Sequence, residues 1–168
     1  MIQKRKKALK VPGPEEWAGH EDDFGAREAH AFWFGKSLDD VQPCFSGGRS
    51  IQRGQELLHM PRRAFQVYIF AFAQFVISEN AVGDPDAANA FLGFLMEREK
   101  RDPGSVAQIY ERLQAAIEFV AESQPRFAAE HDAYGDFREK AAELAKRCGK
   151  LFEPPGPLDE MLDKTDDA

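Results

Sequence analysis

The residues best placed to do chemistry gather near the N-terminus. A group of acids and histidines within eleven residues consists of His20, Glu21, Asp22, Asp23, Glu28 and His30. Oxygen and imidazole ligands of this kind suit hard or borderline cations. However, the spacing of an EF-hand loop and the H-E-x-x-H zinc motif are both absent. We therefore expect a solvated acidic segment here and predict no metal site.

Two further fragments resemble parts of cofactor motifs. The segment "FGKS", residues 34–37, matches the end of a phosphate-binding P-loop, but His30 stands where that motif needs its first glycine. The segment "ELLH", residues 56–59, is one E-x-x-H unit, whereas a di-iron bundle needs two such units and two further glutamates. We therefore expect Gly35 to end a helix, and we predict no bound cofactor.

Two isolated residues have types that can serve in catalysis. Cys44 precedes the glycine-containing segment "SGGRS", and the nearby Arg49 could lower the pKa of its thiol. His131 and Asp132 have the order of a general base and its orienting carboxylate. No histidine lies near Cys44 in the sequence, and helical spacing favours a position for His131 at the edge of the core. The sequence therefore predicts no catalytic residue.

The longest apolar run identifies the element around which the rest of the chain must pack. Between Ala64 and Ile77 only Gln66 and Gln74 are polar. Fourteen residues rise about 21 Å as a helix, less than the ~30 Å hydrocarbon core of a bilayer. The run is also longer than an ordinary strand. Because it is apolar on nearly every side, we predict a central helix that begins at Pro61, and no transmembrane segment.

Apolar stripes at helical spacing predict an all-α fold. We expect a compact bundle of four principal helices, preceded by shorter N-terminal helices. The principal helices are predicted over residues 61–79, 85–101, 106–124 and 126–148.

Capping signals support several of these helix boundaries. Asp84 precedes Pro85 and can cap the second principal helix. Ser105 with Gln108 has the form of a capping box at the start of the third helix. A similar box, Ser37 with Asp40, predicts a short helix before the bundle.

Charge is distributed unevenly along the chain. The 168 residues carry a net charge of −7, but the first ten contain five bases and no acid, which leaves a net −12 in the rest. We expect a flexible basic arm over residues 1–14, a single helical domain over 15–149 and a mobile, acidic, proline-containing tail over 150–168. An acidic body repels nucleic acid, so binding to nucleic acid is not expected.

Cysteine usage and the N-terminal composition bear on location. The two cysteines lie 104 positions apart and match no metal or redox spacing, which indicates reduced thiols. The basic N-terminal residues lead into "VPGPEEW" rather than into an apolar stretch, so no signal peptide is predicted. We therefore expect a cytoplasmic protein.

Residues 60–123 carry a family resemblance. The stretches "MPRRAFQVYIFAFAQFVIS", "FLGFLMEREKRDPG" and "YERLQAAIEFVAES" resemble the layout of small uncharacterised bacterial helical proteins. In these proteins a Pro-x-x-Ala-Phe-x-x-Tyr helix is followed by two amphipathic helices. Some helical immunity proteins, which neutralise toxins in the same cell, share this general layout. The resemblance implies a bacterial cytosolic helical protein and transfers no catalytic residue.

The leading functional hypothesis is a non-enzymatic protein-binding module, of regulatory or immunity type. Its acidic body favours a basic protein partner through surface complementarity. We expect Glu21, Asp22 and Asp23 to contribute to the contact, together with the exposed part of "AHAFWF". Trp33 is the candidate anchor because tryptophan is enriched in interface hot spots, although a core position for Trp33 is the alternative.

Two other classes of function remain open from the sequence. A small-molecule binder or enzyme could use a pocket between the phenylalanine-rich helices. The polar groups available to such a pocket are His59, His131, Tyr68 and Tyr134. A homo-oligomer could instead bury Phe70 or Phe72 against a second copy of the chain.

Overall fold

The computed structural model describes residues 9–151, and within them every regular element is a helix. The α-helices are α1 (Phe24–Trp33), α2 (Leu38–Val41), α3 (Ser50–His59), α4 (Arg62–Ile77), α5 (Pro85–Arg101), α6 (Tyr110–Glu122), α7 (His131–Tyr134) and α8 (Phe137–Arg147). Short 3-10 turns are η1 (His20–Asp22), η2 (Gln42–Phe45), η3 (Glu79–Ala81), η4 (Ala107–Ile109) and η5 (Gln124–Phe127). The all-α prediction is confirmed. Most of the expected basic arm and acidic tail lies outside the described residues.

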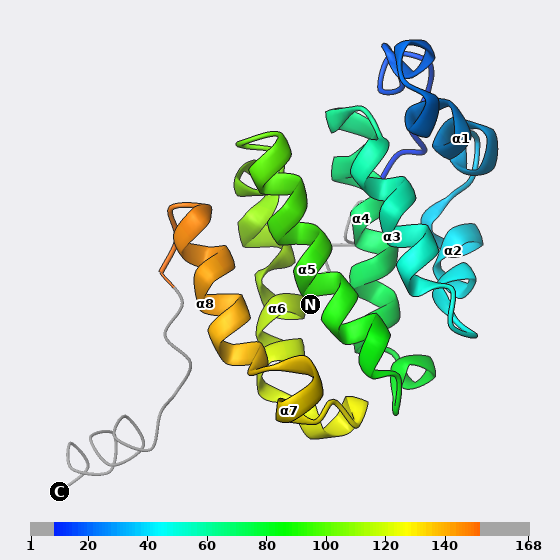
Figure 1. Ribbon diagram of the computed structural model, residues 1–168. Helices are drawn as coiled ribbons and strands as arrows, with labels where there is room; N and C mark the ends of the chain where they lie inside the picture. Colours follow the sequence, from blue (N-terminus) through cyan, green and yellow to red (C-terminus); the bar gives the residue numbers. More distant parts are fainter. Residues whose placement is uncertain (1–8, 152–168) are drawn as a thin grey trace, which may run out of the picture.

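The long helices form two layers (Figure 1). Helices α3, α5 and α8 lie in one layer, with α5 between the other two, while α4 and α6 lie behind them. Helices α4, α5, α6 and α8 alternate in direction, as in an up-and-down bundle. Helices α1 and α2 add a smaller N-terminal layer against α3 and α4. The shorter helices predicted before the bundle are thus present.

Helix α4 is the predicted central helix. Its buried residues are Ala64, Phe65, Tyr68, Ile69, Ala71, Phe72, Ala73, Phe75 and Val76. Pro61 precedes the helix as its N-cap instead of occupying its first turn, and Gln74 and Ile77 are exposed. In the part of the chain that the structure describes, no helix is both long and apolar enough to cross a membrane.

The predicted fourth helix, residues 126–148, is not continuous. The chain instead forms η5, α7 and α8, because Ala128 and Gly135 both adopt positive φ angles, of 55° and 72°. The buried amide of Gln124 stabilises this path: its Nε2 donates to the carbonyls of Ala129 and Gly135, at 3.0 and 2.7 Å. Its Oε1 accepts from the amide of Phe137 at 3.0 Å. One side chain thus satisfies backbone groups that a longer helix would pair internally.

The start of the third principal helix also differs from the prediction. Ser105 does not cap Gln108; its hydroxyl donates to the carbonyl of Arg98 at 3.4 Å. The backbone amides of Gly104, Val106 and Ala107 instead donate to the buried carboxylate of Glu99, at 2.7, 2.8 and 3.2 Å. An acceptor in the last part of α5 therefore satisfies backbone amides that the sequence pattern assigned to Ser105.

Arg98 plays the matching role at the end of α3. Its side chain is buried, and Nη1 donates to the carbonyls of Leu58 and Met60 at 2.9 and 2.7 Å. Nη2 lies 3.4 Å from Asp102, and the guanidinium carbon lies 4.8 Å from the ring centroid of Phe65. Arg98 thereby supplies donors to carbonyls that the end of a helix leaves without partners, and it joins α5 to the turn between α3 and α4.

We predict that Arg98→Met lowers the free energy of unfolding by about 3 kcal/mol, because it leaves buried carbonyls without a donor. Chemical denaturation monitored by circular dichroism measures the change. Arg101→Met is the matched control: Arg101 is exposed and pairs only with Glu97 on the same helix, so its change should stay within about 0.5 kcal/mol. Equal losses in the two variants would contradict the role of Arg98.

Candidate functional site

Trp33, the predicted anchor, lies in the core. Its side chain has no exposed surface, and its Nε1 donates to Glu56 at 2.7 Å. Its ring packs edge-on against Phe45 and Tyr68, with centroids 5.9 and 5.0 Å away. The hydroxyl of Tyr68 hydrogen-bonds to the carbonyl of Trp33 at 2.7 Å. Trp33 therefore joins α1 to α3 and α4 and offers no surface to a partner; the alternative of a core aromatic is confirmed.

The acceptor of Trp33 belongs to a half-buried charged cluster. Glu56 also binds Arg53 at 2.7 Å, and the guanidinium of Arg53 lies 3.7 Å from the ring centroid of Phe32. The ammonium of Lys36 lies 3.5 Å from the same centroid. Burial raises the pKa of Glu56 despite the opposing effect of its hydrogen bonds and of Arg53. The cluster fixes α1 on α3 and is a structural feature.

The predicted acidic segment lies at the edge of the molecule. Glu21 and Asp22 are exposed on η1, and Asp23 caps α1 by accepting from the amide of Ala26 at 2.8 Å. The next residue, Phe24, is 68% exposed. The segment therefore presents two acids beside an apolar ring, while Asp23 has a structural task as well as a charge.

The histidines of this region make aromatic contacts. The rings of His20 and His30 stack with centroids 3.8 Å apart, and Trp17 meets His30 edge-on. Burial, followed by the charge of His20, lowers the pKa of His30. Between residues 9 and 151, no group of three or more potential metal ligands comes together.

The four polar residues considered for a pocket lie at different places in the molecule and have different contacts. His59 lies 3.4 Å from Asp23, beside a hollow of about 310 Å³ at the end of α3. Tyr68 is buried and binds two carbonyls. His131 lines a second hollow, of about 270 Å³, and the hydroxyl of Tyr134 donates to Asp86 at 2.9 Å. The structure does not bring these residues together.

The residues proposed for a homodimer interface differ in exposure. Phe72 is fully buried, so it cannot contact a second copy of the folded chain. Phe70 is half-buried, with the guanidinium of Arg112 4.6 Å from its ring centroid.

Cys44, the thiol considered for catalysis, is half-buried with its sulfur 3.7 Å from the carbonyl of Asp40.

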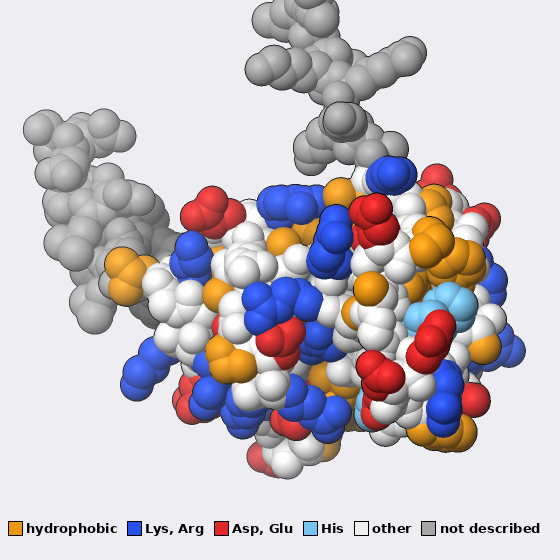
Figure 2. All heavy atoms as spheres, turned by 90° about the horizontal axis from the view of Figure 1, so that it is seen from above, with side chains coloured by type: hydrophobic (Ala, Val, Ile, Leu, Met, Phe, Trp, Pro, Cys, Tyr) orange, Lys and Arg blue, Asp and Glu red, His pale blue; other side chains and the backbone are white. Residues whose placement is uncertain are grey.

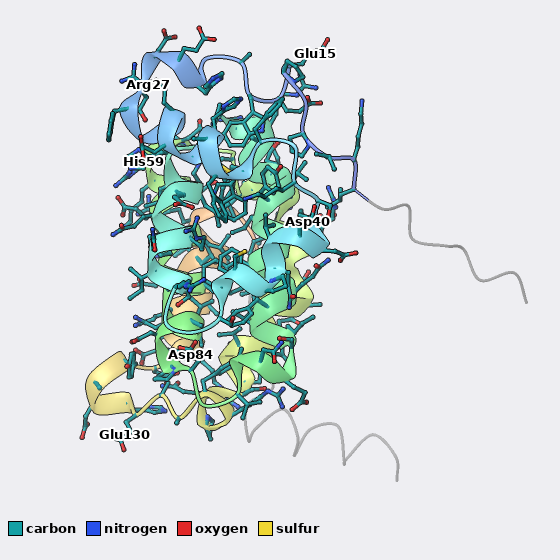
Figure 3. All side chains as sticks on the ribbon, turned by 90° about the vertical axis from the view of Figure 1, so that its right-hand side faces the viewer. Glu15, Arg27, Asp40, His59, Asp84 and Glu130 are labelled. Atoms are coloured by element: carbon teal, nitrogen blue, oxygen red, sulfur yellow. The ribbon has the colours of Figure 1, made fainter. Side chains whose placement is uncertain are left out.

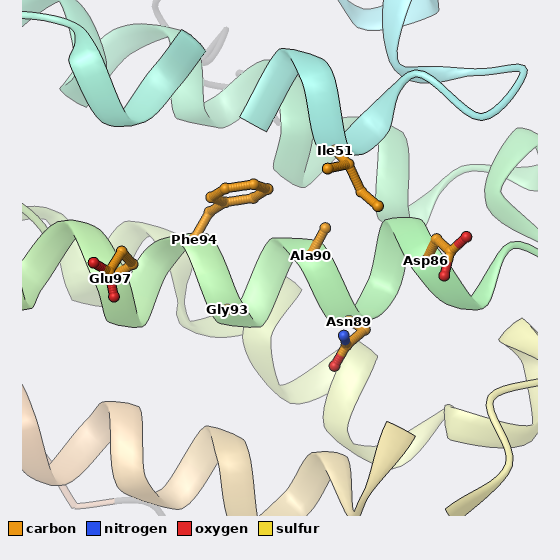
Figure 4. A pocket seen from close by; sticks show the side chains of 7 residues that line it. All are labelled: Ile51, Asp86, Asn89, Ala90, Gly93, Phe94 and Glu97. Carbon is orange, nitrogen blue, oxygen red and sulfur yellow. The ribbon is translucent and has the colours of Figure 1, made fainter. Parts of the chain in front are cut away.

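A groove on the outer side of α5 was not predicted. It has a volume of about 250 Å³, and its lining residues are Ile51, Asp86, Asn89, Ala90, Gly93, Phe94 and Glu97. Figure 4 shows Ile51 and Phe94 on either side of Ala90, in the space between α3 and α5, with Asn89 pointing towards α8. Asp86 and Glu97 stand at its two ends. We call this feature the α5 groove.

Two glycines shape the α5 groove in opposite ways. Gly54 on α3 makes room for Phe94, because a Cβ at position 54 would lie 2.3 Å from the ring of Phe94. Gly93 is exposed in the middle of α5, and a Cβ there would meet no atom within 4 Å. A helical glycine costs about 1 kcal/mol relative to alanine. No contact within the described structure requires a glycine at position 93.

The charges around the groove are arranged along its length. Asp86 accepts from Tyr134, and Glu97 pairs with Arg101 at 3.1 Å on the exposed surface. On the α8 side, Lys140 donates to Asn89 at 2.6 Å. The seven lining residues therefore include two acids and no base, although bases stand just outside the lining.

The acidic segment and the groove share no residue, although the Glu97 end of the groove lies near the end of α3 that carries His59. In Figure 3, His59, which pairs with Asp23, lies towards one end of the bundle, and Asp84, which caps the start of α5, lies towards the other. The end at which α5 finishes carries Lys100 and Arg101, and Lys and Arg side chains are prominent near its centre (Figure 2). The two candidate contact regions consist of different residues, and each is tested with its own variants.

No protein-family model, curated protein or solved structure matches this chain. The resemblance to bacterial helical proteins over residues 60–123 therefore stays an expectation.

We predict that Gly93→Ala raises the free energy of unfolding by about 0.5–1 kcal/mol, because the methyl group meets open space and alanine favours the helix. Gly54→Ala is the matched comparison within α3. Its methyl group collides with Phe94, so this variant should be about 1–3 kcal/mol less stable than Gly93→Ala. Urea denaturation measures both; an equal gain in the two variants would contradict the packing described here.

We also predict that Trp33 fluorescence reports the titration of Glu56. With Trp17→Phe as the background, Trp33 is the only tryptophan left. The fluorescence midpoint should lie above the ordinary pKa of a glutamate, because burial disfavours the charged form. Since the folded-state pKa exceeds the unfolded value, stability relative to Glu56→Gln should rise as the pH falls through this range. A transition that persists in Glu56→Gln would assign it to another group.

Proposed function

We propose that this protein is a non-enzymatic protein-binding module and that the α5 groove is its principal contact surface. The observation that carries the proposal is Gly93, a solvent-facing glycine in the middle of a helix. Alanine there would be more stable and would meet no neighbour among residues 9–151. A helix that omits a side chain at such a position lets another chain approach its backbone closely.

The shape of the groove favours a protein segment over a small molecule. Small-molecule sites are concave pockets, commonly about 300–1,000 Å³, that enclose most of the ligand. The α5 groove is smaller, at about 250 Å³, and it runs along a helix instead of ending in a closed cavity. Its apolar wall consists of Phe94 and of Ile51, which is 45% exposed. Exposed apolar groups beside charged ones are typical of protein contact surfaces.

The acidic segment is the second part of the proposal. Glu21 and Asp22 present negative charge beside the exposed ring of Phe24, and the whole chain has a net charge of −7. A basic protein would be steered towards such a surface and would associate more slowly at high salt. We place the protein in a bacterial cytoplasm, in a regulatory or immunity-type role, on the resemblance of residues 60–123.

Quantitative affinity capture from an extract of the source organism tests the proposal. We predict that Gly93→Gln, which fills the groove from a position with open space, removes at least one protein captured by the wild-type chain. Ala115→Gln, at an exposed position on α6, is the matched control and should keep that protein. If wild type and Gly93→Gln capture the same proteins in equal amounts, the groove is not the contact surface.

A second pair of variants tests the acidic segment in the same capture. Glu21→Lys with Asp22→Lys reverses the exposed charge, while Asp23 is left unchanged because it caps α1. Loss of a captured protein with this double variant, but not with Gly93→Gln, would assign the contact to the acidic segment. Recovery of the chain itself as the lost protein would favour the homo-oligomer.

A further inference from the structure

We infer that the segment bound in the α5 groove is a basic amphipathic helix that lies along α5, with two cationic side chains about three turns apart. This inference rests on the proposed function, because it names the chemistry of the partner at the same surface. It is carried by the register of the lining residues on α5, by the apolar wall and by the placement of the two acids.

The spacing of the lining residues along α5 suits a second helix packed beside it. Asp86, Ala90, Gly93 and Glu97 are spaced i, i+4, i+7 and i+11 on α5, so they form one stripe along its outer side. The two acids are offset by eleven positions, which corresponds to a rise of about 16 Å, or about three turns. Binding by strand addition needs a sheet edge, and residues 9–151 contain no strand. A helix packed along the stripe makes use of its whole length.

The apolar wall gives the partner a defined second face. The side chain of Ile51 projects from α3, and the ring of Phe94, on α5, packs against Gly54 of α3. Both side chains therefore flank Ala90. Opposite them, Asn89 and Lys140 form a polar edge towards α8. An amphipathic helix fits this cross-section with an apolar side towards α3 and a polar side towards α8. Small or medium apolar residues between the two cations allow the closest approach at Gly93.

The positions of Asp86 and Glu97 predict where the cationic side chains of the partner bind. Asp86 uses one carboxylate oxygen for Tyr134, and the Glu97–Arg101 pair is exposed on both sides, so a partner's base can replace it at little cost. The neighbouring Lys140 is engaged by Asn89 and by the carbonyl of Tyr134. The end of the bundle beyond Glu97 is rich in Lys and Arg, which repel a partner with further bases there. The partner's positive charge is thus confined to the length of the groove.

A selection from a phage-displayed library tests the inference. The library consists of 16-residue alanine-rich helices with randomised positions on one face, and it is selected on the full wild-type chain. Enriched peptides are synthesised, and their affinities are measured by fluorescence anisotropy at low and high salt. We predict enrichment of Lys or Arg at two positions eleven residues apart, with apolar residues between them.

The variants identify where and how the peptides bind. Gly93→Gln should weaken binding at least tenfold, and Ala115→Gln should leave it unchanged. Asp86→Asn with Glu97→Gln should also weaken binding about tenfold and should reduce the salt dependence. Asn at position 86 retains an acceptor for Tyr134, so this change tests charge more than structure.

Each outcome separates this inference from the proposed function. Peptides that are lost with Gly93→Gln but lack the paired bases, or that are unaffected by the loss of both acids, overturn the basic helix and leave the groove as a binding surface. Peptides whose binding is unchanged by Gly93→Gln do not use the groove and overturn the inference, as does a selection that enriches nothing. The groove itself is overturned only if Gly93→Gln also leaves the captured proteins unchanged. Circular dichroism of the enriched peptides checks that they are helical.

Discussion

The structure depends on two adjacent buried charges in the last part of α5. Arg98 donates to the carbonyls at the end of α3, and Glu99 accepts from the amides that lead into η4 and α6. Each is the kind of charge-assisted hydrogen bond that gains strength away from water. Arg98 thereby holds the turn between α3 and α4, and Glu99 holds the turn between α5 and α6. Together they set how α3, α4 and α6 enter the bundle.

This anchoring explains how α5 can carry an exposed glycine. The C-terminal part of the helix is stabilised by tertiary hydrogen bonds, and its start is capped by Asp84, which accepts from the amide of Ala87 at 3.1 Å. Its middle can therefore tolerate a residue that costs about 1 kcal/mol in helix propensity. Helical stability in proteins comes mostly from tertiary packing, and here the packing lies on the inner side of the helix. The outer side, with Gly93, carries the proposed contact surface.

Local patterns predicted those features that local interactions determine. The apolar stripe and the Asp84 cap located α5 at residues 85–101, and the Ser37–Asp40 capping box is present. The break in residues 126–148 was missed because it depends on Gln124, whose partners lie five to thirteen residues further along the chain. For Trp33 the sequence left an interface anchor and a core position both open, because the acceptor that holds it in the core, Glu56, is distant in sequence.

The candidate site likewise has features that local sequence determines and others that depend on tertiary contacts. A glycine in a helical pattern reads in sequence as a tolerated irregularity, and its meaning depends on what surrounds it. Gly54 and Gly93 both lie inside helices, yet one is required by the ring of Phe94 and the other faces open space. Only the packing of α3 on α5 distinguishes the two. The acidic segment could be read from composition, but composition does not reveal that Asp23 is also a helix cap. Sequence thus indicates where charge lies, and tertiary structure decides which charges and gaps remain available to a partner.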